Sequence, residues 1–360
     1  MCPCLVFNEG KIVMRINLKK DMFSDREFVL AENGKMKATA FKYSTGIEAL
    51  KVENDKGYFI ILPFQGQQIW RVNFLGKDLV MKTKIEEPIS NCHYLETYGG
   101  FLLHCGISGI GSPKEGDDHL QHGELPNVAY QTAYIECGDD YMAVGGEYKY
   151  DKSFVKSYAF SPECRLYEGD TVLKITVNLE NRRETPLEYM YLCHINFRPI
   201  DGAELVYSAN YKNTVVCRGG ESGELERYMN ELEKNPELHH KVGAAGQVYS
   251  PEICFWADYI GDENNRAYTM QYTDDGACYV SHDVKALPFG VRWISRTGDE
   301  DSMGMILPAT AEHLGYNNAK KKGQVKLLAP KSTLTFTTEA GYLDKSRADA
   351  MKEKIEKMIK

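Results

Sequence analysis

The chain has 360 residues, of which 43% are apolar and 26% charged, a balance typical of a folded globular protein and not of a disordered one. The sequence has 43 Lys and Arg against 51 Asp and Glu, which gives a net charge of −8. It therefore lacks the excess of basic residues that is typical of a nucleic-acid-binding protein. No apolar run is long enough to span a membrane, and the first residues do not read as a signal peptide.

The ten cysteines are too few for a disulfide scaffold of this length. Cys105, Cys193 and Cys254 lie in apolar runs that resemble strands, where cysteine serves as a small buried side chain in a reducing compartment. We therefore expect a cytoplasmic protein without disulfides.

Strand patterns dominate the chain. Two strands are predicted at 58–62 and 68–74, separated by Pro63 and Gly66. Residues 171–179 alternate between apolar and polar, with the apolar side chains on one face, as expected of a half-buried strand.

The second half of the chain continues this pattern. Residues 187–197 are mostly apolar and aromatic, which predicts a strand buried on both faces. Residues 268–273 and 277–280 flank Asp274-Asp275-Gly276 and predict a hairpin. Two further strands, at 324–328 and 333–338, are expected to close the sheet system.

Helical patterns are few. Leu225, Tyr228, Met229 and Leu232 recur at helical spacing between Ser222 and Pro236. Residues 344–360 carry an apolar face and predict a terminal amphipathic helix that packs on the body or on a partner. Many short strands without regular alternation of strands and helices favour one all-β domain, a large antiparallel sandwich over residues 1–360, with 1–44 as an N-terminal extension.

The sequence has no glycine-rich phosphate loop, no Gly-x-Ser-x-Gly elbow and no Cys-x-x-Cys pair. These absences argue against a nucleotide hydrolase, a Rossmann dehydrogenase or a common serine esterase. The remaining candidates for chemistry are histidines in unusual settings.

Two histidine segments stand out. His122 precedes a glycine in a polar loop with Glu124 and Asn127, where a glycine allows close approach of a backbone or a ligand. His194 and Asn196 share one face of an apolar strand, because side chains alternate along a strand, and this pair suggests a pocket wall. The His122 segment also fits a solvated histidine in a polar loop, and the His194 segment also fits a structural histidine in the core.

A third segment contains a carboxylate. Glu312 follows an apolar strand that ends at Pro308, and taken alone it reads as part of a surface turn.

These residues carry a resemblance to the aldose 1-epimerase (galactose mutarotase-like) superfamily, and to its poorly characterised bacterial aldose-epimerase-family branch. The segments that carry it are Leu103-His-Cys-Gly, His122-Gly-Glu-Leu-Pro-Asn and Tyr191-Leu-Cys-His-Ile-Asn-Phe, and weaker matches extend it over residues 45–340. The resemblance implies a galactose mutarotase-like β-supersandwich with few short helices and a sugar-binding cleft.

The resemblance also implies roles for single residues. His194 takes the place of the general acid that protonates the sugar ring oxygen, and His122 takes a sugar-binding place. His104, Asn127, Asn196 and Trp293 are expected to complete the pocket. An imidazole suits proton transfer because its pKa lies near neutrality.

The chain departs from the family pattern at the general base. Leu307 stands where the family has a glutamate, in Gly304-Met-Ile-Leu-Pro, and a leucine cannot accept a proton. Glu312 and Glu124 are the candidate replacements, with Glu312 preferred because it follows the strand that carries the family base.

The sequence thus predicts an isomerase, an aldose 1-epimerase-like enzyme acting at C1 of a free sugar or sugar derivative. It is expected to use no cofactor and no metal, to bind neither nucleic acid nor membrane, and to be a monomer or homodimer. Two alternatives stay open: a metal-dependent sugar isomerase or lyase that uses His119, His122 and Glu124, and a non-catalytic sugar-binding protein.

Overall fold

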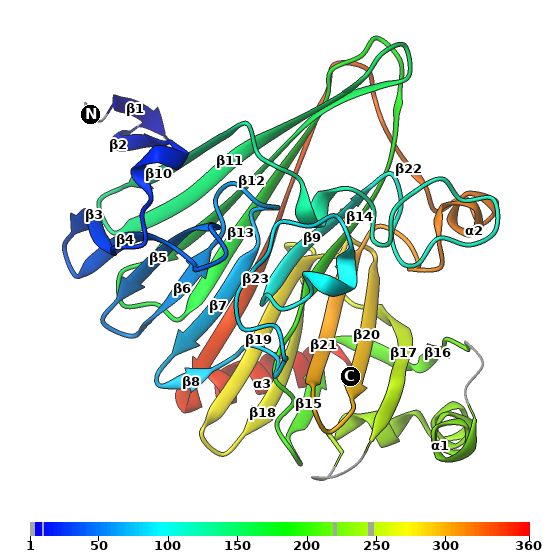
Figure 1. The fold of residues 1–360 in the computed structure, drawn as a ribbon. Coiled ribbons are helices and arrows are strands. Elements are labelled where there is room, and N and C mark those ends of the chain that lie inside the picture. The colour runs from blue at the N-terminus through cyan, green and yellow to red at the C-terminus, as the bar shows by residue number, and fades with distance from the viewer. Residues whose placement is uncertain (1–3, 9–10, 219–221, 244–247) are drawn as a thin grey trace.

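Two large antiparallel sheets form the molecule (Figure 1). The computed structural model describes residues 4–8, 11–218, 222–243 and 248–360. The ten-stranded sheet has the spatial order β1 (Cys4–Asn8), β2 (Lys11–Leu18), β10 (Thr132–Cys137), β11 (Tyr141–Lys152), β12 (Lys156–Tyr167), β13 (Val172–Asn181), β23 (Thr333–Asp344), β19 (Gly276–Asp283), β18 (Arg266–Thr273) and β15 (Glu204–Tyr207).

The thirteen-stranded sheet lies against the first. Its spatial order is β16 (Ala209–Val216), β17 (Tyr249–Tyr259), β20 (Phe289–Arg296), β21 (Asp301–Ala309), β14 (Leu187–Ile195), β9 (Leu102–Ile107), β7 (Ile69–Phe74), β6 (Gly57–Ile61), β5 (Glu48–Asn54), β4 (Met36–Lys42) and β3 (Phe28–Asn33), with β22 (Lys326–Leu328) on β14 and β8 (Lys77–Asp78) on β7.

The main apolar core fills the space between the two sheets. Tyr191 of β14 packs against Phe160 of β12 and Phe336 of β23, with ring centroids 6.0 and 5.0 Å apart. In β13 the four alternating side chains Leu173, Ile175, Val177 and Leu179 are all buried, as their period-two spacing predicts. This confirms the all-β sandwich expected from the sequence.

A second apolar cluster lies on the other face of the thirteen-stranded sheet. Leu103 of β9, Leu192 of β14 and Leu307 of β21 belong to it, and the segments that cover them contribute Tyr94 and Ala319. Coverage on both faces explains why β14 is apolar almost throughout. The candidate site lies in this covering layer.

The helices are short and peripheral. α1 (Gly223–Lys234) buries Leu225, Met229 and Leu232, as its spacing predicts. α2 (Tyr316–Lys321) follows β21, and the described residues also form four short 3₁₀ helices: η1 (Lys20–Met22), η2 (Tyr94–Glu96), η3 (Leu125–Asn127) and η4 (Pro236–His240). Within the described ranges, no helix is long and apolar enough to cross a membrane.

The predicted terminal helix is α3 (Lys345–Met358), and it packs on the body of the molecule. Ala348 and Ile355 are fully buried on the ten-stranded sheet, on the face that points away from the main core. Asp344 caps the helix by accepting a hydrogen bond from the backbone N–H of Arg347 at 3.0 Å.

The register confirms one predicted turn and shows where one predicted strand lies in its sheet. Thr273 pairs with Gly276, so β18 and β19 form the expected hairpin with Asp274 and Asp275 at its tip. The segment 333–338, expected to close the sheet system, is the start of β23, which lies in the interior of its sheet between β13 and β19. The hydrophobic pattern of a segment predicts that it forms a strand but does not predict which strands lie beside it.

Candidate active site

A cavity of about 100 Å³ opens above the covered face of the thirteen-stranded sheet. Its polar lining includes three histidines, one carboxylate, Ser112 and Gln121, and the rest of its wall is mostly aromatic and aliphatic. The lining residues include Tyr94, Tyr98, His122, Leu192, His194, Glu252, Cys254, Trp293, Leu307 and His313. A concave site with few polar groups and much apolar wall is typical of a small-molecule pocket.

His194 points into this cavity from β14, and its tautomer is fixed by Asn196. The Asn196 amide nitrogen donates to the backbone carbonyl of Gly100 at 2.9 Å, which orients its oxygen toward His194. His194 Nδ1 lies 2.7 Å from that oxygen and therefore carries the proton. The Tyr98 hydroxyl donates to the same oxygen at 2.6 Å.

The remaining ring nitrogen of His194 is free to accept a proton. Burial lowers the pKa of His194 to about 4, because the charged imidazolium is poorly solvated there, although the bond to Asn196 raises it. The imidazole is therefore neutral at pH 7, with its lone pair on Nε2. No residue that the structure describes forms a hydrogen bond with this nitrogen.

His122 presents the opposite tautomer. Its Nδ1 accepts a long hydrogen bond of 3.4 Å from the backbone N–H of Gly111, so Nε2 carries the proton. Burial and the neighbouring His194 lower the pKa of His122 well below its usual value, so this ring is also neutral. The two imidazole rings lie 5.2 Å apart, and one offers a donor where the other offers an acceptor.

Backbone geometry holds His122 in place. The residue has φ of 59°, in the left-handed region where histidine is better tolerated than most residues. Its N–H donates to Gly111 O at 2.9 Å, and its carbonyl accepts from Gly106 N at 2.8 Å. At Gly123 a Cβ would lie 2.4 Å from the carbonyl oxygen of Gly106. The glycine beside His122 therefore lets the loop approach β9.

A tryptophan and a carboxylate form the wall opposite these rings. The Trp293 ring lies 5.5 Å from the ring of His194, and its Nε1–H donates to a carboxylate oxygen of Glu252 at 2.5 Å. Glu252 is the carboxylate that lines this cavity. It precedes Cys254 by two residues, a spacing that places both side chains on one face of a strand.

The two carboxylates expected from the sequence lie elsewhere. Glu312 is buried but accepts hydrogen bonds from Lys322 at 2.7 Å and Gln324 at 2.9 Å, outside the cavity. Glu124 accepts from Ser108 and from the Tyr158 hydroxyl. The structure brings neither to His194, because the local hydrogen bonds of each carboxylate hold it away, while Leu307 does line the cavity.

Of the expected pocket residues, Trp293 and His122 line the cavity and the others do not. His104 pairs with Cys193 across β9 and β14, whereas His194 pairs with Leu103, so the two histidines lie on opposite faces of the sheet. His104 packs between the sheets and bonds the Tyr191 hydroxyl at 2.7 Å. Its placement corrects the expectation that it binds the sugar.

Asn127 and Asn196 lie outside the cavity lining and form hydrogen bonds within the protein. Asn127 donates to Thr97 Oγ1 at 2.8 Å and accepts from Gln68 at 3.1 Å, so both ends of its amide are engaged. Asn196 is fully buried and acts through His194. Neither lines the cavity, in contrast to the sequence-based expectation.

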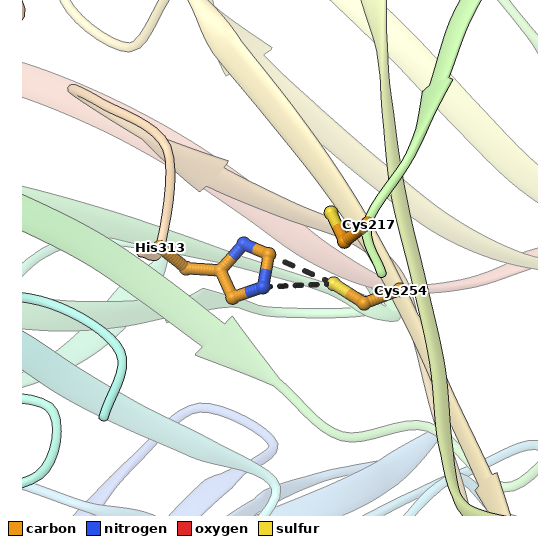
Figure 2. A group of neighbouring side chains, drawn as sticks. All are labelled: Cys217, Cys254 and His313. Atoms are coloured by element: carbon orange, nitrogen blue, oxygen red, sulfur yellow. Dashed lines mark hydrogen bonds between the residues drawn. The ribbon is translucent and has the colours of Figure 1, made fainter. Parts of the chain in front are cut away.

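The candidate ligands of the alternative metal site do not line one common cavity. His119 and Glu124 line a separate surface cavity, whereas His122 lines the one described above. Among the residues that the structure describes, a different trio meets the geometric requirement for a shared metal ion: Cys217, Cys254 and His313 (Figure 2).

Sequence reasoning missed Glu252, Tyr98 and the cysteine–histidine trio as site residues. Glu252 and Cys254 come from β17, and His313 comes from the loop after β21, more than 50 residues along the chain. The available signal was the pair Glu252 and Cys254 at a spacing of two, next to a proline at 251. Only the sheet order brings these segments to His194.

Comparison with known proteins gives one family. The model of the family described as "Domain of unknown function (DUF4432)" matches residues 44–341. The chain belongs to this family. No match is found among curated proteins. The DUF4432 region contains the whole cavity, together with both sheets except the N-terminal strands and the end of β23.

Solved structures share the fold at low identity. The DUF4432 chain is similar to a putative aldose 1-epimerase from Klebsiella pneumoniae subsp. pneumoniae MGH 78578, with a TM-score of 0.79 and 18% identity over 97% of this chain and 92% of that one. A galactose mutarotase-like protein from Clostridium acetobutylicum gives a TM-score of 0.60 and 15% identity over 86% and 98%. The fold is therefore galactose mutarotase-like.

Proposed function

We propose that this DUF4432 chain binds a carbohydrate in the cavity and catalyses acid–base isomerisation at C1, as an aldose 1-epimerase does. The observation that carries the proposal is the pair of neutral imidazoles, His194 with a free acceptor and His122 with a free donor, 5.2 Å apart on one small cavity. The fold and the names of similar structures support the choice of a sugar as the ligand.

In the proposed mechanism one residue, His194, both removes and returns the proton. His194 Nε2 takes the proton of the anomeric hydroxyl, the C1–O1 bond becomes a carbonyl, and the bond between C1 and the ring oxygen breaks. The imidazolium then returns that proton to the former ring oxygen, while the Nε2–H of His122 stabilises the charge that develops there. Rotation about C1–C2 and the reverse steps give the other anomer.

The rest of the cavity supports sugar binding. Trp293 offers an aromatic face of the kind on which sugar rings stack, and Glu252 offers a carboxylate acceptor for a hydroxyl. In this proposal Glu252 replaces Glu312 and Glu124 as the carboxylate of the site. His194 keeps the acid role that the resemblance implies, after first acting as a base.

The test is anomer exchange. We expect the parent protein to speed the interconversion of α and β anomers of at least one free monosaccharide, measured by exchange NMR. His194→Gln should lower that rate by about 10²- to 10⁴-fold without loss of the fold, because the shuttle is removed. His93→Gln is the matched control, since the His93 side chain is exposed and does not line the cavity.

Two results would contradict the proposal. Parent-like exchange by the His194→Gln variant would remove His194 from the route. Sugar binding without exchange in the parent would assign the chain to the sugar-binding proteins without catalysis.

A further inference from the structure

Two cysteines and a histidine converge at the edge of the cavity (Figure 2). Cys217 follows β16 and lies beside Cys254 of β17, where its N–H donates to Cys254 O at 2.8 Å. His313 comes from the loop after β21, and its Nε2 lies 3.2 Å from Cys254 Sγ. One ligand atom from each of the three residues lies within 4.8 Å of the other two.

The loop that carries His313 is fixed by backbone contacts. At Gly111, φ is +77° and a Cβ would lie 1.6 Å from the carbonyl oxygen of His313, so only a glycine allows this approach. Gly111 also pairs with Leu314, and the N–H of Gly315 donates to Ile110 O at 3.3 Å. The histidine is therefore held in position before any ligand binds.

The distances suit a tetrahedral zinc ion. Zinc bonds to sulfur at about 2.3 Å and to nitrogen at about 2.0 Å, which places a sulfur and a nitrogen ligand about 3.6 Å apart. The observed 3.2 Å is close to this value, and a rotation of the half-exposed Cys217 side chain can bring its sulfur nearer. Two thiolates also cancel the charge of a divalent ion, so the buried complex would be neutral.

We propose that Cys217, Cys254 and His313 bind one zinc ion whose fourth position opens into the cavity. Cys254 and His313 line the same cavity as His122 and His194, so a ligand oxygen or a water molecule would complete the coordination. Three protein ligands with one open position is the arrangement of catalytic zinc sites, whereas structural sites are closed by four protein ligands. This inference departs from the metal-free site expected from the sequence.

The experiment measures metal binding directly. Protein purified under reducing conditions and stripped with a chelator is titrated with Co²⁺ and with Zn²⁺. We expect one Co²⁺ per chain with a thiolate-to-cobalt charge-transfer band, and displacement by Zn²⁺ that abolishes the band.

Variants connect the metal to the three residues. Cys217→Ser and His313→Gln should each weaken Zn²⁺ binding by at least tenfold, since even the loss of an outer contact costs about this much. Cys92→Ser is the matched control, because Cys92 is an exposed cysteine elsewhere on the surface. The unfolding midpoint of each metal-free variant checks that the fold is retained.

Three results would overturn the inference. These are Zn²⁺ affinity that is unchanged in both ligand variants, a Co²⁺ spectrum without a thiolate band, and a Cys217–Cys254 disulfide that persists under the reducing conditions and excludes metal. The inference is independent of the proposed function, because metal binding is measured without a sugar and anomer exchange is measured on metal-free protein.

Discussion

At the scale of single residues, the candidate site differs from the sequence-based prediction in which carboxylate it contains. Glu252 lines the cavity beside Trp293, whereas Glu312 is bound by Lys322 and Gln324. A carboxylate that takes part in sugar binding must reach the cavity, and a carboxylate with all of its partners in the protein stabilises the fold instead.

Three isosteric substitutions of glutamate by glutamine test this distinction. Glu252→Gln should lower kcat/KM for anomer exchange by about tenfold or more, because it removes a charged acceptor worth about 1.5–3 kcal/mol. Glu312→Gln and Glu124→Gln should leave exchange unchanged, and Glu312→Gln should cost about 1 kcal/mol in the free energy of unfolding. Exchange rates and urea unfolding of the three variants provide the measurement. A larger loss in Glu312→Gln than in Glu252→Gln would restore the sequence-based assignment.

A site residue was predictable from the sequence where its role is set within its own strand, and was not predictable where its role depends on a distant segment. His194 and Asn196 were recognisable as polar residues on one face of an apolar strand, and both turn out to interact. His104 looked similar, but a shift of one residue in a strand exchanges its two faces. Cys254 looked like a buried apolar residue and is buried, yet its meaning depends on His313, which the sheet order alone brings near.

At the scale of elements, the loop of residues 108–123 connects β9 to the site. It presents His122, pairs with the loop that carries His313, and is pressed against Gly106 through Gly123. Its position therefore depends on a close backbone contact that a side chain would prevent.

A pair of glycine substitutions isolates that contact. Gly123 and Gly202 have similar φ values of 77° and 74°, but a Cβ at Gly202 meets nothing within 4 Å. Gly202→Ala should cost about 1 kcal/mol of stability from φ alone, whereas Gly123→Ala should cost about 2–3 kcal/mol and also reduce anomer exchange. Chemical denaturation compares the two, and equal costs would show that the approach to Gly106 contributes nothing.

The elements themselves were largely predictable. Alternation in β13, the hairpin of β18 and β19, and the apolar faces of α1 and α3 all followed from periodicity. Periodicity did not predict that α3 packs on the ten-stranded sheet or that β23 lies in its interior, because both depend on contacts between distant segments.

At the scale of the whole molecule, buried histidines link stability to pH. His104, His239 and His282 are each at most 2% exposed, and burial lowers their pKa values to about 3, 2 and 3. Each is neutral when folded and gains a proton near pH 6.5 when unfolded. The unfolded state therefore binds more protons below pH 6.5, and stability falls as the pH drops from 6.5 toward 3.

This linkage predicts steep acid unfolding. Each histidine contributes about 1.4 kcal/mol per pH unit in that window, so these three contribute about 4 kcal/mol per unit. The buried His122 and His194, whose pKa values are also lowered, make the slope steeper. From these three groups alone, a typical stability of about 5–15 kcal/mol would be exhausted between about pH 5 and about pH 3. Urea unfolding at pH 7, 6 and 5 gives the slope directly.

One substitution tests the cause of that slope. Neither ring nitrogen of the fully buried His282 has a hydrogen-bond partner among the described residues. His282→Leu should keep the stability at pH 7 and make the decline shallower by about 1.4 kcal/mol per pH unit, since one titrating group is removed. His93→Gln, at an exposed position, should leave the slope unchanged. A parent-like slope in His282→Leu would show that His282 does not contribute to the acid sensitivity.

The place of β23 has a consequence for how the chain is made. β13 and β19, which flank β23 in the sheet, are separated from it in sequence by more than 150 and about 50 residues. As the chain leaves the ribosome, both strands therefore present unpaired edges until residues 333–344 emerge and pair with them. The two halves of the ten-stranded sheet are joined by β23, the last of its strands along the sequence, so this sheet is completed only after residues 333–344 have been translated.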